Sequence, residues 1–176
     1  MVHHTRSYFV SICLATLLCA FIPGAMHAQS NAAKTDALTK DADLIVVGKV
    51  GRVDCAWADG KKRIETRVSV SVDETIKGNA EGNTVMVVVP GGEIDGVGEW
   101  YSHTPRFGQD ENIVLFAKKD SGGKYRVAGG EHGKVSVVKD SRSGKKIVPN
   151  AGTLEEFTTA VKKSVSDNDH VTKQKE

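Results

Sequence analysis

An eight-residue segment in the middle of the chain, residues 100–107 (WYSHTPRF), carries side chains suited to binding another molecule. Trp, Tyr and Arg are the residue types that most often dominate the free energy of protein–protein binding. The candidate recognition residues of the segment are Trp100, Tyr101, His103, Arg106 and Phe107. The segment is either a recognition loop at the mouth of a β-barrel or a plug that closes one barrel end with Trp100 and Phe107. One loop can do both.

The histidines and the cysteine that follow position 28 offer little to a metal ion. They are His103, His132, His170 and Cys55, and none stands at the spacing of a zinc motif such as CxxC or HExxH. We therefore expect no metal and no cofactor. An alternative stays open in which the loop histidines His103 and His132 meet in the fold and serve a small metal-dependent hydrolase.

Other catalytic motifs are missing from the sequence. Ser102 and Ser121 lack the GxSxG pattern of a nucleophile elbow. The acidic stretch at residues 93–99 (EIDGVGE) does not have the ligand spacing of an EF-hand, and we expect a solvated acidic turn there. The sequence thus predicts a protein that is not an enzyme and has no catalytic residues.

Residues 1–28 have the layout of a secretory signal peptide. The apolar run Tyr8–Ile22 has 15 residues, fewer than the roughly 20 that span a membrane. Pro23 and Gly24 follow, and small residues lead to a cleavage site after Ala28. We expect a secreted or periplasmic protein without a membrane anchor after cleavage. Removing Arg6 with this segment lowers the formal charge from +2 to +1, too little basic excess for a nucleic-acid binder.

The rest of the chain is rich in strand patterns. Ile64, Thr66, Val68 and Val70 alternate with polar residues, which is typical of a strand with one face in a core and one in water. Apolar, β-branched runs predict further strands at 43–50, 84–89, 112–117, 125–128 and 135–138. Short turns join them without intervening helices, so we expect a mainly β fold rather than an α/β sheet. The prediction is a small antiparallel OB-like barrel of five to six strands, with a β-sandwich as the alternative.

The two ends of the mature chain complete the predicted organisation. An N-terminal segment at 29–42 has the composition of a short helix, and the β-barrel domain occupies 43–150. A C-terminal helix is expected at 151–166, where Thr153 and Glu156 have the spacing of a capping box. Residues 167–176 are polar, and we expect a disordered tail there.

The order of motifs along residues 41–138 resembles a known kind of domain. It runs from Ala42–Val50 (ADLIVVGKV) through Lys77–Gly78, Pro90–Gly92 and Val114–Phe116 to Gly130–Val135 (GEHGKV). This layout is similar to small exported bacterial OB-like domains, and distantly to netrin-type and metalloproteinase-inhibitor domains. A Gly-Glu turn commonly precedes the strand with the Val114–Phe116 motif in such domains, where this chain has Asp110–Glu111.

The resemblance implies a barrel and a partner such as a secreted peptidase. Inhibitors of that family chelate a zinc ion through an N-terminal cysteine, which a mature chain starting near Gln29 lacks. The resemblance therefore implies the barrel architecture for this chain but not the zinc-chelating mechanism of inhibition. Taken together, the patterns predict an exported, non-enzymatic, protein-binding module, with a metal-dependent hydrolase or an envelope structural module as alternatives.

Overall fold

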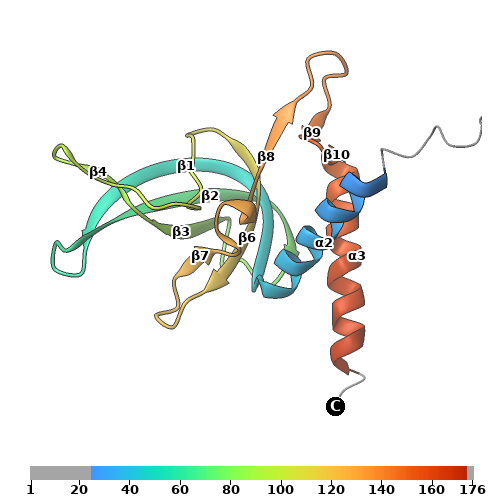
Figure 1. Ribbon diagram of the computed structural model, residues 1–176, viewed down its shortest axis with the longest axis horizontal. Coiled ribbons are helices and arrows are strands. Elements are labelled where there is room, and N and C mark those ends of the chain that lie inside the picture. Colours follow the sequence, from blue (N-terminus) through green and yellow to red (C-terminus); the bar gives the residue numbers. More distant parts are fainter. Residues whose placement is uncertain (1–24, 174–176) are drawn as a thin grey trace, which may run out of the picture.

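The structure is a computed structural model that describes residues 25–173 (Figure 1). Its helices are α2 (Ala25–Asp41), the 3-10 helix η1 (Gly130–Gly133) and α3 (Leu154–Lys173). The strands are β1 (Leu44–Ala58), β2 (Arg63–Lys77), β3 (Thr84–Pro90), β4 (Gly92–Ile94), β5 (Val97–Glu99), β6 (Asn112–Lys119), β7 (Tyr125–Val127), β8 (Lys134–Lys139), β9 (Lys146–Val148) and β10 (Gly152–Thr153).

The central sheet closes on itself. Its order is β1-β2-β3-β7-β6, and β6 pairs again with β1, from Leu44 opposite Ala117 to Lys49 opposite Asn112. The circuit is antiparallel except where β3 meets β7 in parallel at Val87 and Tyr125. Strands β8, β9 and β10 extend the sheet from β6, and β4 and β5 form a separate hairpin. The predicted mainly β, barrel-like fold with a C-terminal helix is confirmed.

The closed circuit β1-β2-β3-β7-β6 has five strands, within the five to six predicted for the barrel. Within residues 25–173 there are ten strands, of which β1, β2, β3, β6 and β8 have six or more residues. The others have two or three residues, too few to produce a periodic pattern in the sequence. A sandwich does not describe the fold, because eight of the strands belong to one hydrogen-bonded sheet.

The continuous apolar run at the start of β1 is explained by burial of both faces of the sheet. Leu44 and Val46 belong to the cluster inside the barrel, whereas Ile45 and Val47 belong to a second cluster that the helices cover. Successive side chains of a strand point to opposite faces, so such a strand is apolar at every position. Gly48 lies at an irregularity in the pairing of β1 with β2, where a Cβ atom would stand 2.2 Å from the Ser71 carbonyl oxygen.

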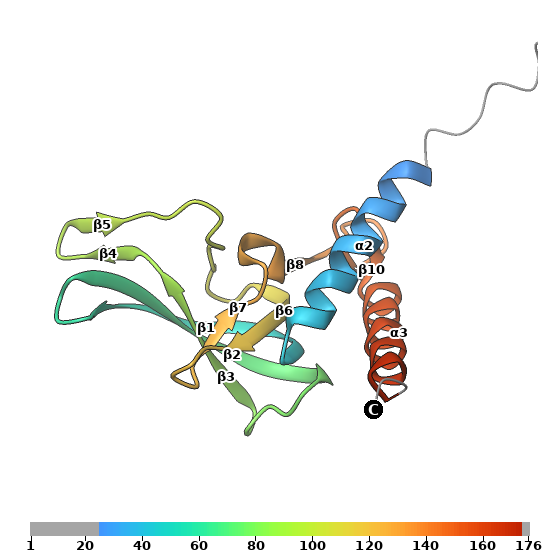
Figure 2. The same cartoon turned by 60° about the horizontal axis from the view of Figure 1, so that its bottom comes forward.

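Both long helices lie on one side of the sheet, and the β4–β5 hairpin lies at the opposite end beside the β1–β2 turn (Figures 1 and 2). Phe157 and Val161 of α3 are buried against the outer face of the sheet. The Ser164 hydroxyl donates a hydrogen bond of 2.6 Å to Asp36, which joins α3 to α2. The Lys77 ammonium of β2 donates to the carbonyl oxygens of Thr39 and Ala42, at the C-terminal end of α2.

The helix bounds correct the predicted ends of the mature chain. Helix α2 begins at Ala25 rather than within 29–42. Of the signal peptide predicted at 1–28, residues 1–24 lie outside the described residues. The Thr153–Glu156 capping box is confirmed, with reciprocal hydrogen bonds of 2.8 and 3.2 Å. Helix α3 does not stop at residue 166 but continues to Lys173, through most of the predicted disordered tail. No helix in residues 25–173 combines the length and the apolar character needed to cross a membrane.

Candidate functional site

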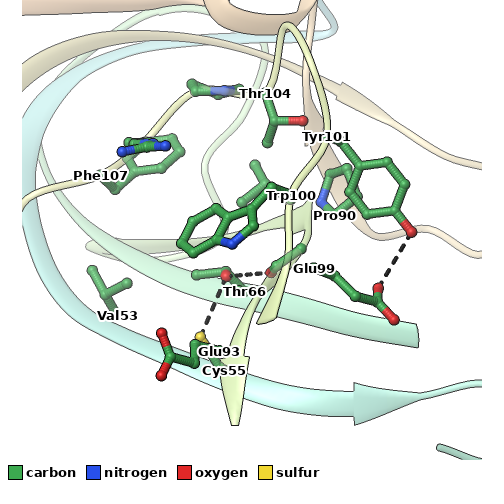
Figure 3. A pocket seen from close by; sticks show the side chains of 15 residues that line it. Val53, Cys55, Thr66, Pro90, Glu93, Glu99, Trp100, Tyr101, Thr104 and Phe107 are labelled. Carbon is green, nitrogen blue, oxygen red and sulfur yellow. Dashed lines mark hydrogen bonds between the residues drawn. The ribbon is translucent and has the colours of Figure 1, made fainter. Parts of the chain in front are cut away.

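A pocket of about 360 Å³ opens at the end of the barrel that is remote from the helices (Figure 3). The ends of β1, β2 and β3, the β4–β5 hairpin and the loop that follows β5 enclose it. Its lining is largely apolar and comprises Val53, Cys55, Thr66, Val89, Pro90, Gly91, Gly92, Glu93, Glu99, Trp100, Tyr101, Thr104, Pro105, Arg106 and Phe107. Four of the five predicted recognition residues therefore line one cavity, together with residues from five strands.

The wall formed by β1 and β2 is held close to the start of the hairpin. The Thr66 hydroxyl donates a hydrogen bond of 2.6 Å to the Gly91 carbonyl oxygen, and the Cys55 sulfur lies 3.5 Å from the same hydroxyl oxygen. Gly92 passes so near that a Cβ atom there would lie 2.6 Å from the Cys55 sulfur. Its φ of 136° is also a conformation that only glycine adopts readily. The sequence therefore needs glycine at this position to form the wall.

Trp100 forms the exposed edge of the pocket. Its side chain is large and apolar, yet the residue remains 67% exposed. The guanidinium carbon of Arg106 lies 5.1 Å from the centroid of its ring, within the range of a cation–π interaction. The ring is thus held in place by a side chain of its own loop while most of its surface faces solvent.

Tyr101 and Glu99 fix the side of the pocket next to Trp100. The Tyr101 hydroxyl donates a hydrogen bond of 3.3 Å to Glu99 Oε2. The same carboxylate oxygen accepts a 3.0 Å hydrogen bond from the backbone N–H of Ile64 on β2. Tyr101 is 46% exposed, so it presents its ring to solvent from a tethered position.

Phe107 anchors the other end of the loop inside the barrel. Its half-buried ring packs against the interior apolar cluster, and the Lys134 ammonium lies 5.6 Å from the ring centroid. The predicted plug is therefore formed by Phe107 and not by Trp100. The structure combines the two interpretations of the segment, because one aromatic residue closes the barrel and the other stays exposed.

A polar network centred on Glu111 supports this anchor. Its carboxylate lies 2.5 Å from the Lys134 ammonium and accepts hydrogen bonds from Ser136 Oγ at 2.7 Å and Gly108 N–H at 3.1 Å. Burial disfavours the charged form of Glu111, but these partners outweigh it and hold the pKa of the carboxyl below its ordinary value. Glu111 belongs to the Asp110–Glu111 pair that this chain has in place of the Gly-Glu turn of similar domains. Its contacts join the loop to β8.

His103 lies away from the pocket and joins the loop to η1. Its ring nitrogen Nδ1 is 3.3 Å from Glu131 Oε1, and the Glu131 backbone N–H donates to the His103 carbonyl oxygen at 2.7 Å. The side chains are 81% and 50% exposed. His103 thus differs in placement from the other four predicted residues, because its described contacts fix the loop rather than line the cavity.

The alternative of a metal-dependent hydrolase finds no assembled ligand set among the described residues. Among the described residues, no three His, Cys, Asp or Glu side chains gather closely enough to hold a metal ion. The acidic stretch at 93–99, predicted as a solvated acidic turn, forms the β4–β5 hairpin, with an exposed turn at Asp95 and Gly96. An Asp-Gly pair between short apolar segments is a strong hairpin signal that the sequence analysis did not use.

Other pocket residues were not predicted from the sequence. Val53, Cys55 and Thr66 lie at least 33 positions before the loop, and nothing in their local pattern links them to it. Two larger cavities, of about 470 and 540 Å³, flank α2, but the aromatic side chains that line them, Phe116 and Phe157, are buried. The pocket at the barrel end is the one with exposed aromatic residues among the cavities described here.

Comparison of the sequence with known protein families and with curated proteins finds no match in either.

Proposed function

We propose that this protein is an exported, non-enzymatic binding module that recognises an extended segment of another protein. Its recognition surface is the pocket lined by Trp100, Tyr101, Arg106 and Phe107. One observation carries the proposal, which is that Trp100 is held in a defined position while 67% of it faces solvent. Export rests on the predicted signal peptide at residues 1–28.

The geometry supports binding because the loop that carries the recognition residues is already ordered in the free protein. The loop is attached at His103 to η1, at Phe107 to the interior of the barrel and at Glu111 to β8. A surface that is already ordered loses less conformational entropy on binding than a flexible one. Exposed aromatic side chains over a mostly apolar pocket then gain free energy when a partner covers them.

A secreted peptidase is the partner that the resemblance to inhibitor domains implies. The sequence has no cysteine at the predicted mature N-terminus, so binding would use the aromatic pocket rather than chelation of a zinc ion. The protein would therefore share the barrel with those inhibitor domains, but it would recognise its partner through the aromatic pocket and not through its N-terminus.

Panning a random peptide library displayed on phage tests the proposed function. The bait is the mature protein, compared with the variants Trp100→Ala and Met86→Ala. Met86 is also a large exposed apolar residue, but it lies on β3 and outside the pocket lining. We expect enrichment of peptides on the wild type and on Met86→Ala, and loss of that enrichment on Trp100→Ala.

Two results would contradict the proposal. One is a failure of any sequence to become enriched above an uncoated surface. The other is an enriched set that binds Trp100→Ala as well as it binds the wild type, which would place recognition elsewhere on the molecule.

A further inference from the structure

We infer that the pocket selects a peptide segment in which an apolar side chain stands next to a basic residue. This inference rests on the proposed function and deepens it by naming the chemistry of the ligand. It follows from the size of the pocket, from the aromatic residues at its edge and from the charges that remain unpaired around it.

The pocket is the right size for part of a polypeptide. Cavities that hold whole small molecules usually measure about 300–1,000 Å³, and this one, at about 360 Å³, stands at the low end. Val53, Val89 and Phe107 supply apolar walls for one inserted side chain. The exposed ring of Trp100 stands at the edge, where it can pack against the neighbouring residues of the same segment.

The charged side chains that line the pocket are two carboxylates, Glu93 and Glu99, and one guanidinium, Arg106, so the net charge of the lining is negative. Glu93 lines the cavity, and its carboxylate makes no hydrogen bond or ion pair with any residue of the described chain. In Figure 3, Glu93 lies beside Cys55, at the end of the pocket opposite Thr104. Asp95, at the turn of the same hairpin, is likewise without a partner among residues 25–173.

No cation near the pocket forms an ion pair with Glu93 in the described part of the chain. Arg106 lies over the Trp100 ring, and Arg63 on β2 forms an ion pair of 2.5 Å with Asp59. Lys61 and Lys62, on the turn between β1 and β2, are outside the cavity lining. A ligand that enters beside Glu93 therefore meets an uncompensated carboxylate. A lysine or arginine next to the inserted side chain pairs with it, whereas an acidic residue there is repelled.

Fluorescein-labelled synthetic peptides test this inference by anisotropy titration. The probes are three hexapeptides. Each has a central pair, Lys-Phe, Glu-Phe or Lys-Gly, with two glycines on either side. For the wild type we expect Lys-Phe to bind about five-fold more tightly than Glu-Phe, since an exposed ion pair contributes up to about 1 kcal/mol. Lys-Gly is expected to bind at least about ten-fold more weakly than Lys-Phe, because the apolar contact is lost.

The variant Glu93→Lys is expected to reverse the preference, so that Glu-Phe binds more tightly than Lys-Phe. Glu155→Lys is the matched control, because Glu155 is an exposed glutamate on α3, away from the pocket, and this variant should keep the wild-type preference. Glu93→Gln provides a milder change that should remove the preference without reversing it. Circular dichroism of each variant establishes that it is folded.

Equal binding of Lys-Phe and Glu-Phe by the wild type would overturn the inference, as would an unchanged preference in Glu93→Lys. If both peptides bind equally and Trp100→Ala abolishes that binding, the proposed function stands and the charge preference is wrong. If no peptide binds, the inference is wrong, and the outcome of library panning decides the proposed function separately.

Discussion

The guanidinium carbon of Arg106 lies 5.1 Å from the centroid of the Trp100 ring, and both residues belong to the same loop. Five residues separate them in the sequence, yet the loop between them folds back so that the cation covers one face of the indole. Pro105, which is buried, fixes the chain just before Arg106. The remaining surface of Trp100 faces solvent beside the pocket, where a partner can contact it.

Replacing Arg106 with alanine is expected to weaken binding of the Lys-Phe peptide by two- to five-fold. An exposed cation–π contact contributes about 0.5–1 kcal/mol, and its loss frees the Trp100 ring to move. Arg106→Lys should retain more of the affinity, because a lysine ammonium can occupy the same face of the ring. Anisotropy titration measures both variants. Tighter binding by Arg106→Ala would show that the guanidinium blocks the ligand rather than positioning the indole.

Replacing Glu111 with glutamine is expected to lower the free energy of unfolding by about 1–2 kcal/mol at neutral pH. The substitution leaves the ammonium of Lys134, which is only 13% exposed, without its anionic partner. Urea unfolding measures the change. An unchanged free energy of unfolding would mean that the Glu111–Lys134 pair does not hold the loop.

The contribution of Glu111 depends on pH in a defined direction. The pKa of its carboxyl is lower in the folded chain than its ordinary value of 4.5, so its stabilisation is complete above that value. Stabilisation is lost as the pH falls from there through the folded-state pKa. The difference in free energy of unfolding between wild type and Glu111→Gln should therefore shrink below pH 4.5. If the difference in free energy of unfolding grows as the pH falls, the lowered pKa of Glu111 is contradicted.

Replacing Gly92 with alanine is expected to lower the free energy of unfolding by about 3 kcal/mol, since it combines backbone strain with a steric clash. The added methyl group would lie 2.6 Å from the Cys55 sulfur and 2.7 Å from the Thr66 hydroxyl oxygen. Gly96→Ala is the control, because Gly96 also has a positive φ but no atom within 4 Å of an added Cβ. It should cost about 1 kcal/mol. Equal losses in thermal unfolding would show that the wall is not tightly packed at Gly92.

Replacing Lys77 with methionine is expected to lower the free energy of unfolding by about 1–2 kcal/mol, because the carbonyl oxygens at the end of α2 lose a charged donor. The Lys77 ammonium reaches these oxygens, of Thr39 and Ala42, at 2.8 and 2.6 Å. Lys62→Met, on the exposed β1–β2 turn, is the control and should leave stability almost unchanged. A matching loss in both variants would refute a role for Lys77 in docking α2.

The sequence was sufficient to predict the strands because their burial follows the side-chain pattern. Ile64, Val68 and Val70 alternate with polar residues and are buried, as the alternation predicted. The C-terminal helix was predicted from its capping box, but its end was not. Lys163 pairs with Asp167 at 2.7 Å, and Ser164 binds Asp36 of α2. These contacts stabilise a polar segment whose composition alone is typical of a tail.

The pocket was only partly predictable, for a reason of geometry. The residue types in the loop singled out Trp100, Tyr101, Arg106 and Phe107, and the structure places these four in the lining of one cavity. Their opposite wall, which includes Cys55 and Thr66, comes from strands that curl around the barrel to meet the loop. Such a meeting depends on register and twist, and no local pattern in the sequence encodes it.

The most direct test of the account is the pair of indole N–H signals in a 1H–15N correlation spectrum of the mature protein, recorded as the Lys-Phe peptide is added. Trp57 and Trp100 are the two tryptophans of the chain, and the variant Trp100→Phe assigns their signals. The account predicts that the Trp100 signal shifts with saturation while the Trp57 signal, from outside the pocket lining, stays in place. A Trp100 signal that does not move at saturating peptide would contradict it.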